Sequence, residues 1–223
     1  MKIQTLLELI DTTTQEKQYR GRFNDKPKNT APVANEIGLG AYSKVRQHRH
    51  DPHMVTKQHH SPKAAKLDKF NQFAKFVIEN KLTDNPHFPR LYNVTKITDN
   101  KGDYVYKYDI EKLENLYELD KNELFNIYET HFERDSRDMH KISKMTAMDI
   151  ADQIAYEIED GIDGTTGIVK SESLAQALSI LNKYLREVRY SEDRETINDI
   201  HAENVMIRRG KYGYQLVITD PFA

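Results

Sequence analysis

The stretch Asp199-Ile200-His201-Ala202-Glu203-Asn204, with the residues that follow it, decides how this chain is interpreted. An apolar run, a turn that contains glycine and a second apolar run come next, and Asp220 follows them. Two apolar runs joined by a glycine-containing turn predict a β-hairpin. The hairpin would carry two carboxylates and one amide on its two sides, from Asp199, Asn204 and Asp220.

This set of side chains suits phosphoryl transfer from a nucleotide. In that reaction magnesium meets the developing charge, and the attacking hydroxyl must be positioned and relieved of its proton. Asp199 is the candidate for orienting or deprotonating the acceptor, while Asn204 and Asp220 are the candidate magnesium ligands. The sequence therefore favours a phosphotransferase.

The composition excludes several other classes of protein. With 223 residues, of which 38% are hydrophobic, the chain can bury one substantial core or two small lobes. A net charge of -2 gives no global field that would attract nucleic acid or an anionic membrane, so a nucleic-acid partner is not expected. The absence of cysteine excludes a disulfide scaffold and a thiolate metal site. Without a long apolar run or a targeting signal, we expect a soluble cytoplasmic protein with no membrane partner.

The first third of the chain changes from polar to strand-like. Ile3, Leu6, Leu7 and Ile10 have helical spacing and predict a short amphipathic helix, and residues 12–35 are interpreted as an extended or mobile tether. From residue 36 onward the pattern predicts three short strands, a helix at about 62–80, and a hairpin at 90–98 and 104–110. The alternating Tyr104, Tyr106 and Tyr108 would share one face of the second hairpin strand.

The remainder of the chain is predicted to be mainly helical. Periodic apolar residues indicate helices at roughly 121–133, 145–160 and 172–190, the last ending near Ser191, and the charged stretch 134–144 is interpreted as a loop. The fold class is therefore α+β. We divide the chain into an N-terminal helix and tether at 1–35, a β-rich lobe at 36–112, and a reduced helical lobe with the C-terminal hairpin at 113–223.

Two features of the β-rich region fit a nucleotide site. Gly38 and Gly40 lie between two predicted strands, a context that favours a flap over a nucleotide rather than a dinucleotide fold or a Walker loop. Lys57 ends a later strand and would reach under this flap toward phosphates. Such a lysine needs an acidic partner on the following helix, and the candidates are Asp68 and Glu79, while the uncharged Gln72 occupies another plausible register.

These segments together resemble the protein-kinase-like fold. The resemblance is carried by Gly-x-Gly-x-Tyr-Ser-x-Val at 38–45, by Val-Thr-Lys at 55–57, by Asp-Ile-His-Ala-Glu-Asn at 199–204, and by Val-Ile-Thr-Asp at 217–220. The Asp-x-His-x-x-Asn form is similar to that of aminoglycoside and choline phosphotransferases. The ending Ile-Thr-Asp-Pro resembles kinase-like proteins of tailed bacteriophages, which we consider the closest resemblance.

The resemblance implies a two-lobed fold, with a small antiparallel β N-lobe carrying one helix and a reduced, mainly helical C-lobe. It also implies binding of ATP and Mg²⁺, with Asp199 as catalytic base, His201 near the γ-phosphate or the acceptor, and Asn204 and Asp220 as magnesium ligands. The residues implied to bind the nucleotide are Gly38, Gly40 and Ser43 in the phosphate flap, Val45 over the adenine, Lys57 at the phosphates, Ile110 as gatekeeper, and Glu111 and Leu113 through their backbone groups.

Some features depart from the family. Ile197-Asn198 replaces the His-Arg that precedes the catalytic aspartate, so no switch by activation-loop phosphorylation is expected. Only Pro221-Phe222-Ala223 follows Asp220, which leaves no activation segment. We therefore expect a minimal Ser/Thr-type protein kinase of phage type, located in the host cytoplasm if phage-encoded. The acceptor, a protein or a small molecule, is left open, and the alternative is a pseudokinase-like regulator that binds nucleotide or a host protein without transfer.

Two further clusters receive structural interpretations. The histidines between residues 48 and 60 are taken as part of a polar exposed hairpin rather than a zinc site, because no cysteine or tight carboxylate set completes a tetrahedral site. The basic run Arg208-Arg209-Gly210-Lys211 is taken as a soluble hairpin tip rather than a nucleic-acid patch. A metal- or nucleic-acid-binding module is the least favoured function.

Overall fold

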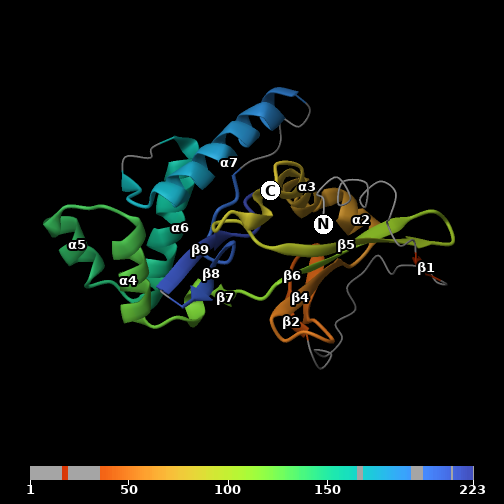
Figure 1. The fold of residues 1–223 in the computed structure, drawn as a ribbon, viewed down its shortest axis with the longest axis horizontal. Helices are drawn as coiled ribbons and strands as arrows, with labels where there is room; N and C mark the ends of the chain where they lie inside the picture. The colour runs from red at the N-terminus through yellow and green to blue at the C-terminus, as the bar shows by residue number, and fades with distance from the viewer. Residues whose placement is uncertain (1–16, 20–35, 165–167, 192–197, 212, 223) are drawn as a thin grey trace. The chain divides into compact units, whose positions relative to one another are not determined.

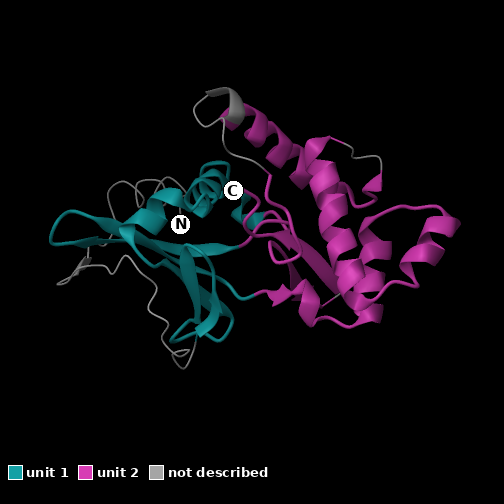
Figure 2. Ribbon diagram, turned by 180° about the vertical axis from the view of Figure 1, so that it is seen from behind, with its two compact units in different colours: residues 1–84, 90–112 teal, residues 85–89, 113–223 magenta. Residues whose placement is uncertain are grey.

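The computed structural model describes residues 17–19, 36–164, 168–191, 198–211 and 213–222. The chain forms two compact units (Figure 2). The first contains residues 1–84 and 90–112, and the second contains residues 85–89 and 113–223. The predicted helix at 3–10 lies outside the described residues.

The first unit is built on a six-stranded sheet with the order β1-β5-β6-β4-β3-β2 (Figure 1). The strands are β1 (Lys17–Tyr19), β2 (Glu36–Leu39), β3 (Ser43–Gln47), β4 (Met54–His59), β5 (Leu91–Asp99) and β6 (Tyr104–Glu111). All neighbours pair antiparallel except β1, which runs parallel to β5. The three short strands and the hairpin predicted from sequence are confirmed.

Strand β1 corrects the prediction for the polar segment at 12–35. Lys17 pairs with Ile97 and Tyr19 with Asp99, so part of the predicted tether is a strand. The three residues show no alternating apolar pattern, because their pairing is supplied by a strand that lies about 80 residues further along the chain.

The single helix predicted at 62–80 is wrong, because the chain forms two helices, α2 (Pro62–Leu67) and α3 (Phe70–Glu79). Ser61 caps the first helix by accepting a hydrogen bond from the Ala64 N–H with its side chain, and Pro62 occupies the first helical position, where a missing N–H costs little. Asp68 ends this helix in an extended conformation, and its carboxylate accepts a hydrogen bond of 2.9 Å from the Phe70 N–H at the start of the next. The break leaves Leu67 exposed, whereas the apolar residues of α3 at helical spacing are buried, namely Phe70, Ala74, Val77 and Ile78. A short 3₁₀ helix, η1 (Leu82–Asp84), follows.

The second unit combines helices with a three-stranded sheet. The sheet has the order β7 (Glu114–Asn115), β8 (Val205–Gly210), β9 (Gly213–Ile218), and a 3₁₀ helix, η2 (Leu116–Glu118), follows β7. The α-helices are α4 (Lys121–His131), α5 (Ser136–Ile142), α6 (Ala147–Asp163) and α7 (Glu172–Ser191). The predicted C-terminal hairpin and the predicted helices that correspond to α4, α6 and α7 are confirmed. The chain is therefore α+β, with an antiparallel sheet in its N-terminal part and a mainly helical C-terminal part.

Helix α5 corrects the loop predicted at 134–144. Asp135 caps it by accepting hydrogen bonds from the N–H groups of Arg137 and Asp138, and Ile142 is buried. The helix is only seven residues long, so the charged residues around its one buried position masked its period.

Helix α6 is held in the core of the second unit by a buried carboxylate. Glu157 is fully buried, and its Oε1 accepts hydrogen bonds from Arg134 at 2.6 Å, Tyr128 at 2.7 Å and Gln153 at 2.8 Å. Burial, together with the hydrogen bond to this carboxylate, raises the pKa of Tyr128 to about 12. The face of α6 that carries Ile150, Ile154 and Ile158 therefore has one fixed orientation toward the core.

Helix α6 continues through Gly161 and ends at Asp163, a few residues beyond the predicted end at about 160. Gly164 takes the left-handed conformation at the C-cap, with φ of 106°. Gly161, one turn earlier, permits a close approach of α7, because a Cβ atom there would lie 2.5 Å from Leu178 Cδ1. None of the helices in the described residues combines the length with the apolar composition that a membrane span requires.

His87 joins three separated segments of the second unit. Its Nδ1 donates to the Leu216 carbonyl at 2.8 Å, and its Nε2 accepts from the Ser173 hydroxyl at 2.9 Å. The ring is fully buried and lies 6.0 Å from that of His131. Burial lowers the pKa of His87 to about 4, with smaller effects from the nearby His131 and Arg208.

Acid should therefore destabilise the second unit. Between pH 6.5 and 4 the unfolded chain binds a proton at His87 that the folded chain does not, so the free energy of unfolding falls as the pH is lowered, by on the order of 3 kcal/mol for this one group. Urea unfolding at a series of pH values measures this slope. His87→Gln should flatten it, and replacement of the exposed His140 by Gln should not. A wild-type stability that stays constant between pH 6.5 and 4 would contradict the assignment.

Candidate active site

The β8–β9 hairpin brings the predicted catalytic residues of the second unit together. The ladder pairs Val205 with Ile218, so the residues before β8 and after β9 leave the sheet side by side. Two main-chain hydrogen bonds continue the pairing, from Thr219 N–H to the Asn204 carbonyl at 2.9 Å and from Asp199 N–H to the Pro221 carbonyl at 3.0 Å. Asp220 thus lies between two residues that are bonded to the 199–204 loop.

Within this loop, the side chain of Asn204 is fixed by its amide nitrogen. Nδ2 donates to the Asp199 carbonyl at 2.8 Å and lies 2.9 Å from His201 Nε2. Because an amide nitrogen can only donate, Nε2 is the acceptor and the ring proton is on Nδ1. Both contacts use the nitrogen, so they determine where the carbonyl oxygen Oδ1 points. That oxygen is the atom a metal ion would need.

The side chains of Asp199 and His201 in this loop are accessible to solvent. The exposed fractions of the Asp199 and His201 side chains are 45% and 47%, and His201 Nε2 lies 4.0 Å from Asp199 Oδ2. The half-buried Asp220 is followed by Pro221 and Phe222, which are buried, and the Phe222 ring lies 5.2 Å from that of Tyr184. The segment after Asp220 is therefore packed, while the Asp199 side chain is open to solvent.

In the first unit, the predicted glycine flap is the connection between β2 and β3. Gly40 N–H donates to the Ser43 carbonyl at 2.8 Å, and the Gly40 carbonyl lies 3.1 Å from His60 Nε2. A Cβ atom at Gly38 would lie 3.9 Å from Val45 Cβ, which is ordinary contact. The hairpin itself therefore has room for a side chain at Gly38, and the fold does not account for the glycine. Ser43 is buried.

Of the three positions considered as partners of Lys57, the structure places Asp68 next to it. Its Nζ lies 4.0 Å from Asp68 Oδ2 and 3.7 Å from the centre of the Phe70 ring. Glu79 instead pairs with Lys75 at 3.6 Å on the exposed side of α3, and Gln72 lines a cavity of about 190 Å³ between α3 and the sheet. The alternatives left open by the sequence are thus reduced to Asp68.

Asp68 also binds a buried histidine, which corrects the interpretation of the histidine cluster. His59 is 2% exposed, and its Nε2 lies 3.1 Å from Asp68 Oδ2. Burial alone would raise the pKa of Asp68, but hydrogen bonding from His59 and the charge of Lys57 outweigh it, and the pKa lies below its usual value. Among the described residues, no three His, Cys, Asp or Glu side chains gather as a metal site.

The other predicted nucleotide-binding residues lie on the central strands or just after them. Val45 on β3 pairs directly with Lys57 on β4, which places the two side chains on one face of the sheet. Ile110 is buried in β6. Glu111 N–H donates to the Arg90 carbonyl at 3.1 Å, so a backbone contact to adenine from this residue would fall to its carbonyl group. Leu113 follows at the start of the second unit.

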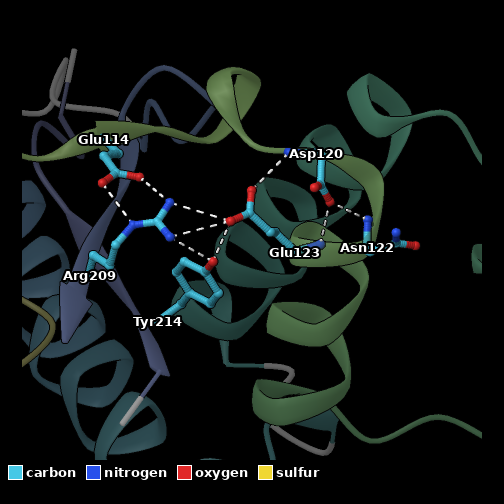
Figure 3. Close-up of polar contacts among 6 residues, drawn as sticks. All are labelled: Glu114, Asp120, Asn122, Glu123, Arg209 and Tyr214. Carbon is cyan, nitrogen blue, oxygen red and sulfur yellow. Dashed lines mark hydrogen bonds and ion pairs between the residues drawn. The ribbon is translucent and has the colours of Figure 1, made fainter. Parts of the chain in front are cut away.

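The basic run at 208–211 is not simply a solvated hairpin tip, as the sequence suggested. Arg208 donates to the carbonyls of Pro86 at 2.6 Å and Phe88 at 3.0 Å, and it thereby attaches the 85–89 segment to β8. Arg209 forms two hydrogen bonds of 2.9 and 3.0 Å with Glu114 on β7 (Figure 3). It also contacts Glu123 and Tyr214, which connects the sheet to the first turn of α4. These arginines stabilise the unit that carries the candidate site.

Comparison with known proteins gives no family model that matches the chain, and no curated protein matches its sequence. The functional argument therefore rests on the residues and their geometry.

Removal of the Asp68 carboxylate should destabilise the first unit strongly. Asp68→Ala leaves the half-buried Lys57 and the buried His59 without their shared acid and removes the hydrogen bond that the Phe70 N–H donates at the start of α3, so the free energy of unfolding should fall by about 2–4 kcal/mol. Glu79→Gln, which affects only an exposed pair, should cost less than about 0.5 kcal/mol. Chemical denaturation followed by circular dichroism compares the two variants, and equal losses would show that the contacts of Asp68 with Lys57 and His59 do not stabilise the first unit.

Proposed function

We propose that the chain is an ATP- and Mg²⁺-dependent phosphotransferase with a two-lobed protein-kinase-like fold, a minimal Ser/Thr-type protein kinase of phage type. The observation that carries the proposal is the pair of main-chain hydrogen bonds that join Asn204 to Thr219 and Asp199 to Pro221. They gather one exposed carboxylate, one oriented amide and a second carboxylate from two separate segments. A cytoplasmic location, in the host cell if the protein is phage-encoded, is part of the same proposal.

In this proposal Asp199 accepts the proton of the attacking hydroxyl. Its exposure allows an acceptor to reach it, and its main-chain N–H and carbonyl are both hydrogen-bonded, which fixes the backbone from which the side chain projects. His201 orients the Asn204 amide. Oxygen atoms of Asn204 and Asp220 suit Mg²⁺, which prefers hard oxygen ligands and would neutralise the charge on the transferred phosphoryl group.

The first unit would supply the nucleotide contacts. Gly38 and Gly40 would let the backbone approach phosphates, and Lys57, positioned by Asp68 and the Phe70 ring, would pair with them. Val45 opposite Lys57 would contact the base. The proposal therefore assigns the nucleotide contacts to residues of the first unit and the metal contacts to residues of the second.

Transfer should depend on Asp199. Purified protein with Mg²⁺ and ATP labelled in its γ-phosphate should phosphorylate itself or a component of a bacterial lysate, and Asp199→Asn should lower the rate by about 10²–10⁴-fold because the proton acceptor is lost. Glu129→Gln, at an exposed position of α4, is the matched control and should keep the wild-type rate. Mass spectrometry of the labelled products identifies the acceptor.

Two results would reject the transfer activity. One is a background-level signal that is the same for wild type and Asp199→Asn. The other is a rate that Asp199→Asn does not change. Retained nucleotide binding with no transfer would identify the pseudokinase-like regulator instead.

Nucleotide binding should depend on residues of both units. At saturating ATP and Mg²⁺ the melting temperature of the wild type should rise by about 5 °C or more. Lys57→Met in the first unit and Asp220→Asn in the second should each reduce the rise, because one loses a phosphate contact and the other a metal ligand. Lys75→Met, on the exposed side of α3, should not.

The same measurement without Mg²⁺ separates the two effects. With ATP alone, Asp220→Asn should show the same shift in melting temperature as the wild type, while Lys57→Met should still show a smaller shift. If ATP and Mg²⁺ do not shift the wild-type melting temperature, or if only one of the two variants affects the shift, the roles proposed for Lys57 and Asp220 in binding ATP and Mg²⁺ are excluded.

A further inference from the structure

One surface of the second unit combines exposed apolar side chains with acidic ones. The side chains of Tyr117, Met148 and Tyr156 are 45%, 62% and 53% exposed, and they are among the few large hydrophobic residues that the described part of the chain leaves open. Met148, Asp152 and Tyr156 follow each other at intervals of four residues and form one stripe along α6. We name this stripe, with Tyr117, Asp160 and Asp163, the acidic tyrosine face.

The aromatic and acidic parts of this face are joined directly. The Tyr117 hydroxyl donates to Asp152 Oδ1 at 2.5 Å, and this hydrogen bond raises the pKa of Tyr117 to about 12. Tyr117 also experiences the charge of Glu203, which lies in the 199–204 loop. The face therefore extends from α6 toward the candidate catalytic loop within the same unit.

The charged residues of α6 are all acidic, and the stability of the helix does not require this. Its acidic residues are Asp149, Asp152, Glu157, Glu159, Asp160 and Asp163, and it contains no basic residue. Asp149 belongs to the capping box with Thr146, and Glu157 is paired with Arg134 in the core. The remaining acids include a group in the last turn, where the negative end of the helix dipole disfavours them. Intrahelical stability therefore does not account for these charges, but attraction of a cationic partner would.

We propose that the acidic tyrosine face binds a basic peptide segment of a protein acceptor. Lysine or arginine side chains would pair with Asp152, Asp160 and Asp163, their cations would also contact the tyrosine rings, and an aliphatic side chain would pack on Met148. The inference rests on the proposed function in so far as the bound peptide is the phosphate acceptor, and it selects a protein rather than a small molecule.

Direct binding tests the surface without requiring catalysis. The full chain is titrated into a fluorescently labelled short peptide of Lys, Arg, Leu and one Ser, with peptides of the same length that carry Gln or Glu in place of the basic residues as controls. The basic peptide should raise the anisotropy with a dissociation constant that weakens as salt is added, and the other two should not bind.

Charge removal then locates the site. Asp152→Asn with Asp160→Asn should weaken the basic peptide by at least about fivefold, since each lost ion pair contributes up to about 1 kcal/mol. Glu129→Gln with Glu187→Gln removes the same charge from α4 and α7 and should change the affinity by less than about twofold. Unchanged melting temperatures show that both double variants are folded.

Several outcomes would overturn the inference. These are no binding of the basic peptide, equal binding of the neutral or acidic peptide, and equal weakening in both double variants. Binding of spermine to the chain at concentrations where the peptide does not bind would identify a small polycation as the ligand and overturn the peptide assignment.

The transfer reaction separates this inference from the proposed function. If both are right, the α6 double variant should raise KM for the basic peptide with an unchanged kcat, and Asp199→Asn should abolish transfer while peptide binding persists. If the peptide binds at the acidic tyrosine face but the wild type transfers no phosphate, the proposed function alone is contradicted. If phosphate is transferred to the peptide but the α6 double variant does not change the KM, the inference alone is contradicted.

Discussion

The candidate site depends on the way two main-chain hydrogen bonds extend the β8–β9 hairpin beyond its last ladder pair. Because Asn204 is bonded to Thr219 and Asp199 to Pro221, two segments with no regular structure of their own take defined positions. The side-chain amide of Asn204 adds a third connection inside the loop. This arrangement uses main-chain groups and the buried Phe222, so the side chains of Asp199, Asn204 and Asp220 are not needed to join the two segments through the Thr219 and Pro221 hydrogen bonds.

The sequence predicted much of this because local periodicity and turn chemistry act over short distances. The apolar period of α6 and α7, the Ser61-Pro62 start of α2 and the C-terminal hairpin are all specified by neighbouring residues. The proximity of Asp199, Asn204 and Asp220 follows once the hairpin is recognised. No family relationship was needed for these predictions.

The errors occurred where a distant residue decides the local structure. Asp68 interrupts the helix because its carboxylate is shared among the Phe70 N–H, Lys57 and His59, two of which lie on β4. Strand β1 exists through pairing with β5. Arg208 and Arg209 looked like surface charges, yet they bind the carbonyls of 86 and 88 and the acid of Glu114. Periodicity carries no information about such partners.

The position of His87 has a consequence for biosynthesis. The histidine leaves the ribosome with the first unit, yet its two partners are Ser173 and Leu216, the latter 129 residues further along the chain. The 85–89 segment must therefore remain unsatisfied while most of the second unit is translated, and the core around it closes only when β9 emerges. Ordering of the 85–89 segment is therefore coupled to the synthesis of β9 rather than to that of the strands that flank the segment in sequence.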